Sequence, residues 1–323
     1  MIKSSVTIGI PAYNEERNIA ALLRSIFSQK RNSYKLESII VVCDGCTDKT
    51  VDIVGAFAKK NKQILRPNGL KQSFSTNRKI KLIVGDQRRG KAIALNRIYA
   101  LNKSDYLLTI DADIVLETDK VIDLLVKAIQ KDPSLNIVGP RHVPVYPPTL
   151  MGKFAYVSYL SFEDAFLKLD SGNNFYAVMT ANLIRKEFSK SFKYPKGTIS
   201  DQNYLYAMAT KDNRKGFKFV RNARVLFSPV STFMDWRILG VRSVSGDKED
   251  AVKHFGEEIL EYYSMPKKIM IQSLIKWFLK SPVYTLGSVL MNLYVRMFPY
   301  EKVKPKDGKW ELATSSKQLI KLT

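Results

Sequence analysis

The segment YLLTIDAD, residues 106–113, places two acidic residues directly after a short, mostly apolar run. A short, mostly apolar run of this kind is typical of a buried strand in a parallel sheet. Ligands of such sheets bind at the carboxyl ends of the strands, where Asp111 and Asp113 fall. The segment therefore predicts an α/β fold with a polar site at one edge of its sheet.

Apolar runs and helical patterns alternate on both sides of this segment. The predicted strands are residues 6–10, 36–42, 81–84, 106–110, 136–138 and 225–227, with Pro11 ending the first. The predicted helices begin near residue 14 and span 50–60, 90–101, 119–130, 153–169 and 201–210, and 61–79 is expected to be a loop. Such β-α-β alternation predicts a mostly parallel, doubly wound Rossmann-like sheet with helices on both faces.

The composition is that of a folded, strongly basic protein. The chain has 323 residues, 45% of them hydrophobic, enough for one large domain with an appendage or for two modest domains. The 52 Lys and Arg exceed the 30 Asp and Glu, so the net charge is +22. This charge predicts an anionic partner: nucleic acid, an anionic membrane or a phosphorylated substrate. A solvated basic surface is the alternative.

The two cysteines, Cys43 and Cys46, have the spacing of a redox pair or of half a zinc site. A zinc site needs two more ligands, and the chain's histidines are His142 and His254. Two cysteines make no disulfide framework, so we expect a reducing compartment. Residues 1–16 contain only a short apolar run and no small-residue cleavage site, so we expect no signal peptide and a cytoplasmic location.

Asp111 and Asp113 flank the small Ala112, so both carboxylates can turn toward one point. Paired hard oxygens suit Mg²⁺ or Mn²⁺, which proteins hold through one or two carboxylates together with phosphate oxygens. Such an ion neutralises a pyrophosphate leaving group. The D-x-D pattern is common in sequences, and a loop cap is its alternative role.

Three further motifs precede this pair, each at a predicted strand end or helix start. They are Pro11-Ala12-Tyr13-Asn14-Glu15, Asp44-Gly45-Cys46-Thr47-Asp48 and Gly90-Lys91-Ala92-Ile93-Ala94-Leu95-Asn96. In this order, and followed by D-x-D, they resemble the P-x-Y/F-N-E, D-x-S/T-D and G-K-x-x-A-L-N motifs of the inverting family-2 glycosyltransferases with the GT-A fold. The resemblance is strong over residues 5–115 and thinner up to residue 246.

The resemblance implies a catalytic domain at 1–246, with a donor-binding half at 1–115 and an acceptor half at 116–246. It implies a nucleotide-sugar donor, typically a UDP-sugar, and Mg²⁺ or Mn²⁺ held by Asp113 and Asp111. The donor-binding residues that it implies are Pro11, Tyr13, Glu15, Asp44, Lys91, Asp111 and Arg242. Of these, Tyr13 and Glu15 would flank the nucleoside and Asp44 would accept a hydrogen bond from the base. The alternatives are simple packing for Tyr13 and a solvated helix position for Lys91.

Inverting sugar transfer also needs one general base to deprotonate the acceptor hydroxyl. The resemblance places this base at a helix start well after D-x-D, and Asp201, 88 residues after Asp113, fits that position. The family's preceding Glu is replaced by Ser200, so helix capping is the alternative role for Asp201. Glu163 and Asp164 form a rival pair inside a predicted helix.

Processive members of the family carry a Q-x-x-R-W motif, which this chain matches only at Arg242. Leu239 replaces the Gln and Ser243 replaces the Trp. A guanidinium near a diphosphate is chemically apt, and the missing Trp predicts single transfers. His254 is a candidate third metal ligand, with an ordinary surface histidine as the alternative.

The C-terminal segment, 247–323, is predicted to be helical. Residues 265–323 carry 11 Lys or Arg and 3 Asp or Glu. The longest uncharged stretch, 281–295, is 15 residues and contains Pro282, which is short of the roughly 20 residues that a spanning helix needs. Apolar and aromatic residues among basic ones predict an amphipathic helical pair on anionic lipid, at the inner face of the cell membrane. A hairpin packed on the catalytic domain and a dimer contact are the alternatives.

The leading hypothesis is therefore inverting transfer of a sugar from a nucleotide diphosphate to a lipid-linked or glycan acceptor, without a nucleic-acid partner. A sugar-phosphate nucleotidyltransferase is one alternative, but it needs a glycine-rich basic loop where this chain has the acidic motif 11–15. A basic nucleic-acid-binding protein is the other, and it needs no paired carboxylates at strand ends.

Overall fold

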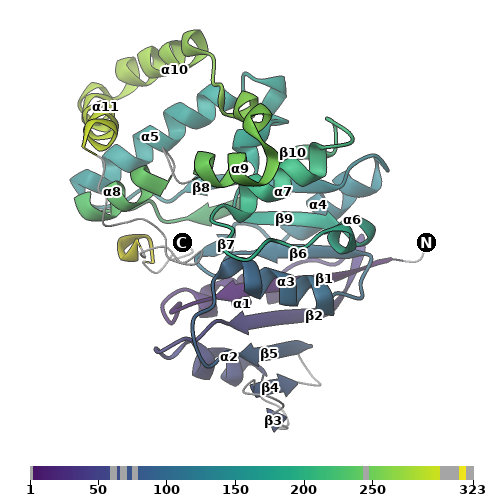
Figure 1. Ribbon diagram of the computed structural model, residues 1–323. Coiled ribbons are helices and arrows are strands. Elements are labelled where there is room, and N and C mark those ends of the chain that lie inside the picture. Colours follow the sequence, from purple (N-terminus) through teal and green to yellow (C-terminus); the bar gives the residue numbers. More distant parts are fainter. Residues whose placement is uncertain are drawn as a thin grey trace.

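The computed structural model describes residues 3–58, 64–65, 71–74, 79–242, 247–298 and 313–317. Through these residues runs one mixed sheet with the strand order β3-β4-β5-β2-β1-β6-β9-β8-β10-β7 (Figure 1). The strands are β1 (Ser4–Ala12), β2 (Tyr34–Cys43), β3 (Ile64–Leu65), β4 (Lys71–Phe74), β5 (Ile80–Val84), β6 (Tyr106–Ile110), β7 (Ile114–Leu116), β8 (Ile137–Pro144), β9 (Ala181–Arg185) and β10 (Phe217–Phe227). The helices are α1 (Ile19–Phe27), α2 (Thr50–Ala58), α3 (Lys91–Leu101), α4 (Val121–Gln130), α5 (Leu150–Phe166), α6 (Lys186–Ser191), α7 (Asp201–Thr210), α8 (Phe233–Val241), α9 (Asp247–Phe255), α10 (Lys267–Lys280) and α11 (Pro282–Met297).

The centre of the sheet is parallel, as predicted. Strands β5, β2, β1 and β6 are parallel neighbours, and all of β6 is buried. Beyond them β9 runs antiparallel to both β6 and β8, while β8 and β10 are again parallel. Residues from α1, α2 and α4 form the core on one face of the sheet, and residues from α3, α6 and α7 form it on the other. The predicted α/β sheet with a parallel centre and helices on both faces is confirmed, and antiparallel pairings with β4, β7 and β9 make the whole sheet mixed.

Some predicted boundaries were wrong. The expected loop at 61–79 contains β3 and β4, because antiparallel pairing with β5 extends the sheet where the sequence has no apolar pattern. The first strand continues through Pro11 to Ala12. The first helix begins at Ile19 rather than near residue 14, because Asn14 adopts a left-handed φ of 53° and a turn follows.

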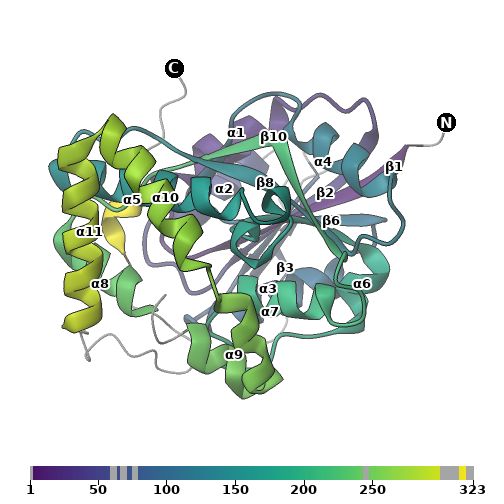
Figure 2. The same ribbon diagram turned by 90° about the horizontal axis from the view of Figure 1, so that it is seen from above.

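The predicted C-terminal helical segment is present as an antiparallel pair, α10 and α11, at one end of the molecule (Figure 2). Both helices pack on α5, and α11 also packs on α8. Asp164 of α5 accepts a hydrogen bond from Ser273 of α10 at 2.8 Å, and Asn292 of α11 donates to Ser158 at 3.0 Å. The alternative of a hairpin packed on the catalytic domain is therefore observed. Among the helices described here, none has the length and apolar character to cross a membrane.

Candidate active site

A cleft of about 510 Å³ opens at the carboxyl ends of β1, β2 and β6. It is lined by residues between 11 and 114, by residues between 142 and 247, and by Ala313, Ser316 and Lys317. The lining contains all of the predicted donor-binding residues, both aspartates of the D-x-D motif and the predicted general base, namely Pro11, Tyr13, Glu15, Asp44, Lys91, Asp111, Asp113, Asp201 and Arg242. The fold therefore brings together side chains that are up to 231 positions apart in the sequence.

Lys91, the first residue of α3, lies between two carboxylates of the cleft. Its Nζ is 2.8 Å from Asp111 Oδ2 and 3.1 Å from Asp201 Oδ2. Burial alone lowers the pKa of Lys91, but the charges of Asp111 and Asp201 outweigh burial and raise that pKa above its usual value. Lys91 is thus a fixed cation that joins the end of β6 to the start of α7.

Asp111 and Asp113 differ in their partners. Burial raises the pKa of Asp111 to about 6, with Lys91 opposing the rise and the charges of Asp201 and Asp113 adding to it. Asp113 lines the cleft with no hydrogen bond or ion pair to any other described residue. An unpartnered carboxylate beside a second one fits a hard divalent cation.

The described residues include no group of three or more His, Cys, Asp or Glu placed to hold a metal. Mg²⁺ does not require such a cage, because it commonly takes one or two carboxylates and completes its shell with water and substrate phosphates. The donor set at Asp111 and Asp113 is therefore suited to an ion that arrives with a phosphorylated ligand. The thiols of Cys43 and Cys46 are free, and no third metal ligand from the described part of the chain joins them.

Asp44 has a structural task that the sequence did not indicate. Its carboxylate accepts hydrogen bonds from the backbone N–H groups of Arg89, at 2.9 and 3.0 Å, and Gly90, at 2.7 Å. Gly90 has a φ of 106°, which an L side chain rarely adopts. Asp44 thus holds the sharp turn that aims Lys91 into the cleft, and its role toward a nucleotide base stays a prediction.

Two cations that sequence reasoning missed complete the other side of the cleft. The Arg88 guanidinium lies 4.5 Å from the centroid of the Tyr13 ring. Lys317 is 2.6 Å from the Glu15 carboxylate and donates to the carbonyl of Tyr13 at 2.7 Å. Arg88 comes just before the G-K motif in the sequence, so sequence analysis could have identified it as a candidate site residue. Lys317 was not, because it is 304 residues from Tyr13 and belongs to no motif.

Glu15 should make the folded protein less stable as the pH rises. Burial raises its pKa from the ordinary value of 4.5 to about 7, the charge of Asp113 adds to the rise, and Lys317 opposes it. Between these two values the folded state holds a proton that the unfolded state has released, so stability falls as pH rises. Glu15→Gln should match the wild type near pH 5 and exceed its unfolding free energy by about 1–3 kcal/mol at pH 8.

Urea unfolding in metal-free buffer at several pH values measures this difference. Glu37→Gln, a change of the same chemistry at an exposed side chain, is the control and should show no such trend. A stability difference between Glu15→Gln and the wild type that does not change with pH would contradict the assignment.

Asp201 is the first residue of α7 and is largely buried. Its carboxylate faces Lys91, and the Ser200 side chain makes no capping bond at this helix. The rival carboxylates lie outside the cleft lining. Glu163 forms a two-pronged ion pair with Arg141, and Asp164 is bound to α10. Of the three, the structure brings only Asp201 to the cleft.

Arg242 follows α8, and its Nε is 4.0 Å from Asp247 Oδ1. Burial raises the pKa of Asp247 to about 6, with Arg242 opposing the rise and the charge of Asp201 adding to it. His254 is not in the cleft lining. Its Nε2 lies 3.3 Å from Asp250, and its ring meets that of Tyr204 edge-on. The structure therefore does not bring His254 to the two aspartates.

The model of the glycosyl transferase family 2 matches residues 7–192, more than half of the chain. The chain belongs to glycosyl transferase family 2. The match covers the four motifs from Pro11 to Asp113 and ends before Asp201 and Arg242. Family membership confirms the resemblance and favours the glycosyltransferase hypothesis over both alternatives.

Relatives within this family are moderately similar to the chain. Poly-beta-1,6-N-acetyl-D-glucosamine synthase of Staphylococcus epidermidis is 26% identical over 152 residues, or 47% of this chain and 32% of the relative. The synthase of the same name from Staphylococcus aureus strain COL is 23% identical over 236 residues, which are 72% of this chain and 50% of the relative. A probable glycosyltransferase of Bacillus subtilis, YdaM, is 29% identical over 161 residues, which are 49% of this chain and 34% of the relative. The chain thus matches half or less of the length of these relatives.

Two solved structures have the same fold. Mannosyltransferase PcManGT from Pyrobaculum calidifontis, in complex with GDP-Man and Mn²⁺, superimposes with a TM-score of 0.55 at 18% identity, covering 91% of this chain and 86% of the other. Glucosyl-3-phosphoglycerate synthase from Mycobacterium tuberculosis, with Mn²⁺, UDP-glucose and phosphoglyceric acid, gives 0.51 at 15% identity, covering 77% and 79%. This family-2 chain therefore has the predicted GT-A fold.

Proposed function

We propose that this protein is an inverting glycosyltransferase that moves a sugar from a nucleotide diphosphate, with UDP favoured, to a lipid-linked or glycan acceptor. The observation that carries the proposal is the joining of Asp111 and Asp201 by Lys91, beside the unpartnered Asp113. The carboxylates of Asp111 and Asp113 thereby lie next to that of Asp201, which comes from the other half of the domain. This is the arrangement that donor binding and acceptor deprotonation need in one cleft.

The donor side is proposed to need Mg²⁺ or Mn²⁺, held by Asp113 and Asp111. When bound, such an ion neutralises the charge of the diphosphate leaving group. Both solved neighbours were crystallised with Mn²⁺ and a nucleotide sugar, one a GDP-sugar and the other a UDP-sugar. Of this chain's own groups, Lys91 and Arg242 supply positive charge near the diphosphate, and Tyr13 and Glu15 flank the nucleoside.

The acceptor side depends on Asp201. A carboxylate at the start of α7, in the half of the domain opposite the nucleotide motifs, takes the proton of the attacking hydroxyl as the new glycosidic bond forms. Its side chain is largely shielded from bulk water. Because the Trp of the processive motif is absent at position 243, we propose single transfers rather than polymerisation.

The direct test is nucleoside diphosphate release from a panel of UDP- and GDP-sugars, with Mn²⁺ and a detergent extract of lipid acceptors. We expect release with one donor and its loss on addition of EDTA. Absence of turnover with every donor, together with absence of UDP and GDP binding by calorimetry, would reject the function.

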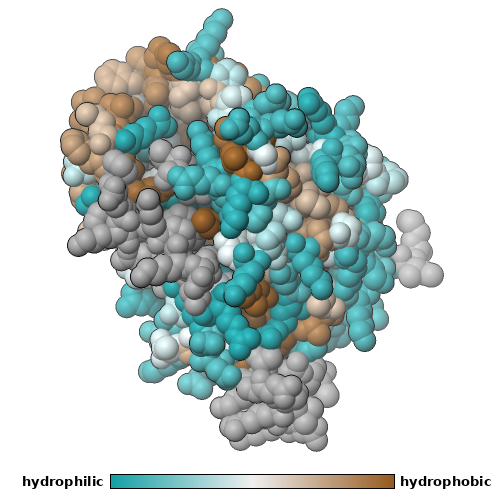
Figure 3. Space-filling model, in the orientation of Figure 1, coloured by the Kyte–Doolittle hydropathy of each residue, from teal (hydrophilic) through white to brown (hydrophobic). Residues whose placement is uncertain are grey.

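We further propose that the protein acts as a peripheral protein at the inner face of the cell membrane. The outer face of α10 and α11 carries large apolar side chains that are 49–79% exposed, namely Ile271, Ile275, Phe278, Leu279, Val283, Leu286, Leu290 and Met297. Figure 3 shows hydrophobic residues gathered at this upper left end of the molecule. Lys280 lies on α10 and suits anionic lipid, whereas Lys276 of the same helix is paired with Asp164 of α5.

The double variant Ile275→Glu and Leu279→Glu should lose binding to phosphatidylglycerol vesicles. Burying one large apolar side chain contributes about 1.5–3 kcal/mol, so losing two predicts at least a tenfold drop in the vesicle-bound fraction in co-sedimentation. Leu260→Glu, a charge placed at an exposed Leu away from the hairpin, is the matched control. Equal sedimentation of both proteins would exclude this face as the membrane contact.

A further inference from the structure

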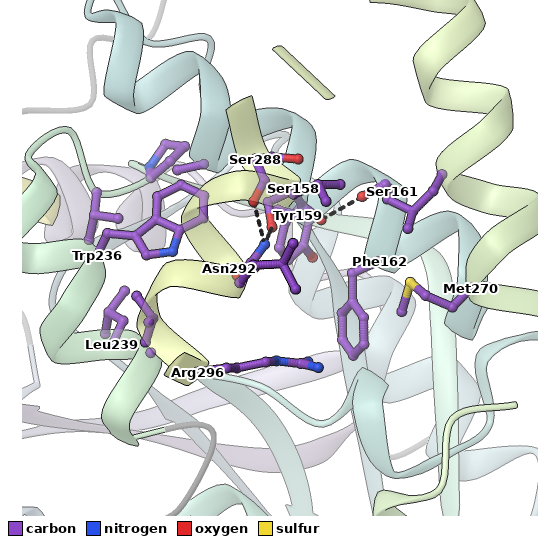
Figure 4. A pocket seen from close by; sticks show the side chains of 18 of the residues that line it. Ser158, Tyr159, Ser161, Phe162, Trp236, Leu239, Met270, Ser288, Asn292 and Arg296 are labelled. Atoms are coloured by element: carbon purple, nitrogen blue, oxygen red, sulfur yellow. Dashed lines mark hydrogen bonds between the residues drawn. The ribbon is translucent and has the colours of Figure 1, made fainter. Parts of the chain in front are cut away.

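A second cavity, of about 940 Å³, lies between the C-terminal hairpin and the catalytic domain. We call it the hairpin cavity. Its walls are mostly apolar and come from α5, α8, α10 and α11 (Figure 4). They include Phe162, Trp236, Leu239, Met270 and Val289. The volume is at the upper end of the roughly 300–1,000 Å³ usual for small-molecule sites.

The hairpin cavity borders the active-site cleft. Phe227, Pro229, Val230 and Leu239 line both spaces. A molecule in the hairpin cavity therefore lies beside the cleft that holds Asp201. This shared wall relates the cavity to the acceptor side of the proposed reaction.

The uncharged polar groups in the wall are mostly satisfied by other protein groups, and the cationic Arg296 and Lys248 also line the cavity. Asn292 donates to Ser158 Oγ at 3.0 Å and to the carbonyl of Ser288 at 2.9 Å, as Figure 4 shows. Tyr159 donates to the carbonyl of His142 at 2.8 Å. A hydroxyl-rich glycan would find few free partners here and would lose its bonds to water. An aliphatic chain has no hydrogen bonds to water to lose, so the apolar part of the wall favours a hydrocarbon.

Polar groups gather on the side of the cavity that adjoins the cleft. Lys248 lies 5.8 Å from the ring centroid of Tyr263, and Tyr263 donates to the carbonyl of Asp247, a residue of the cleft lining. The buried Tyr176 hydroxyl, which also lines the cavity, has no hydrogen-bond partner among the described residues. An anionic or ester-bearing head group would meet these side chains while its chain stays in the apolar part.

We propose that the hairpin cavity holds the aliphatic chain of a lipid acceptor and presents its head group to Asp201. The inference rests on the proposed glycosyltransferase function and makes its acceptor a lipid rather than a free glycan. At about 30 Å³ per methylene-sized group, the cavity has room for up to roughly 30 such groups. The exposed apolar face of the hairpin lies on the same two helices, so a lipid held at the membrane surface lies close to the cavity.

Quenching of Trp236 fluorescence tests occupancy without any need for activity. The chain has three Trp, and Trp277→Phe with Trp310→Phe leaves only Trp236, a largely buried residue of the cavity wall. Monomeric 9,10-dibromostearate should quench this protein, and stearate should not. Adding Val289→Phe, which fills the cavity, should reduce the quenching several-fold, whereas Leu290→Phe on the exposed face should not. No quenching, or equal quenching in both variants, overturns the proposal.

Acceptor kinetics test the same cavity in turnover. With n-alkyl glucosides and n-alkyl phosphates of increasing length, KM should fall by about fourfold per buried methylene. Val289→Phe should abolish this dependence but leave the Kd for UDP and Mn²⁺ unchanged. Equal use of short and long acceptors overturns the proposal. Failure of UDP binding in the wild type would instead reject the glycosyltransferase function. The quenching result would still decide whether the hairpin cavity binds an aliphatic chain.

Discussion

Asp201→Asn should lower kcat by about 100- to 10,000-fold, because general-base catalysis contributes on that scale and an amide cannot accept the acceptor's proton. The amide keeps the size of the side chain, and Lys91 keeps its 2.8 Å bond to Asp111. The Kd for UDP and Mn²⁺ should therefore change by only a few-fold. The acidic limb of the pH profile of kcat/KM should disappear in the variant.

Three measurements distinguish this role from a structural one. Thermal unfolding reports whether Asp201→Asn is folded, calorimetry reports UDP binding, and product release reports turnover. Asp212→Asn removes the same charge at an exposed site and should leave all three unchanged. A kcat for Asp201→Asn within tenfold of the wild type would show that another group removes the proton.

Asp113→Asn should reduce Mn²⁺-dependent UDP binding by about 100-fold or more and lower kcat/KM at least as far. A bound divalent cation contributes several kcal/mol of charge stabilisation, and each 1.4 kcal/mol is tenfold in binding. Asp113 makes no hydrogen bond or ion pair to other described residues, so the substitution breaks no native contact. The folded state should be at least as stable as the wild type.

Calorimetric titration with UDP, with and without Mn²⁺, measures this effect. The wild type should bind much more weakly without the metal, and Asp113→Asn should bind weakly in both conditions. Asp212→Asn should behave as the wild type. If Asp113→Asn retained the full Mn²⁺ dependence, the ion would be held elsewhere in the cleft.

The parts of the site that sequence reasoning found share one physical feature. Asp44, Asp111 and Asp113 each follow a buried strand, and Lys91 begins a helix just after another. Parallel strands bring such ends to one edge, so position in the sequence predicts position in space. The same logic failed for β3 and β4, because an edge strand is held by backbone pairing and needs little apolar pattern.

Sequence reasoning also left the C-terminal hairpin undecided between a membrane and the catalytic domain. The structure packs its inner face on α5 and leaves its outer face exposed, so packing does not exclude membrane contact. The periodicity of an amphipathic helix reports one apolar face. It does not report that the two inner faces enclose a cavity next to the active site.

The sequence by itself determined the parallel centre of the sheet, most of the helices that cover it and the family, because hydrophobic period and strand-end motifs are local properties of the chain. Only the tertiary structure decided that Lys91 joins Asp111 to Asp201, that Lys317 pairs with Glu15, and that the hairpin cavity borders the cleft. These are contacts between residues from 20 to about 300 positions apart. Such contacts depend on how completed elements pack, and no local pattern records that packing.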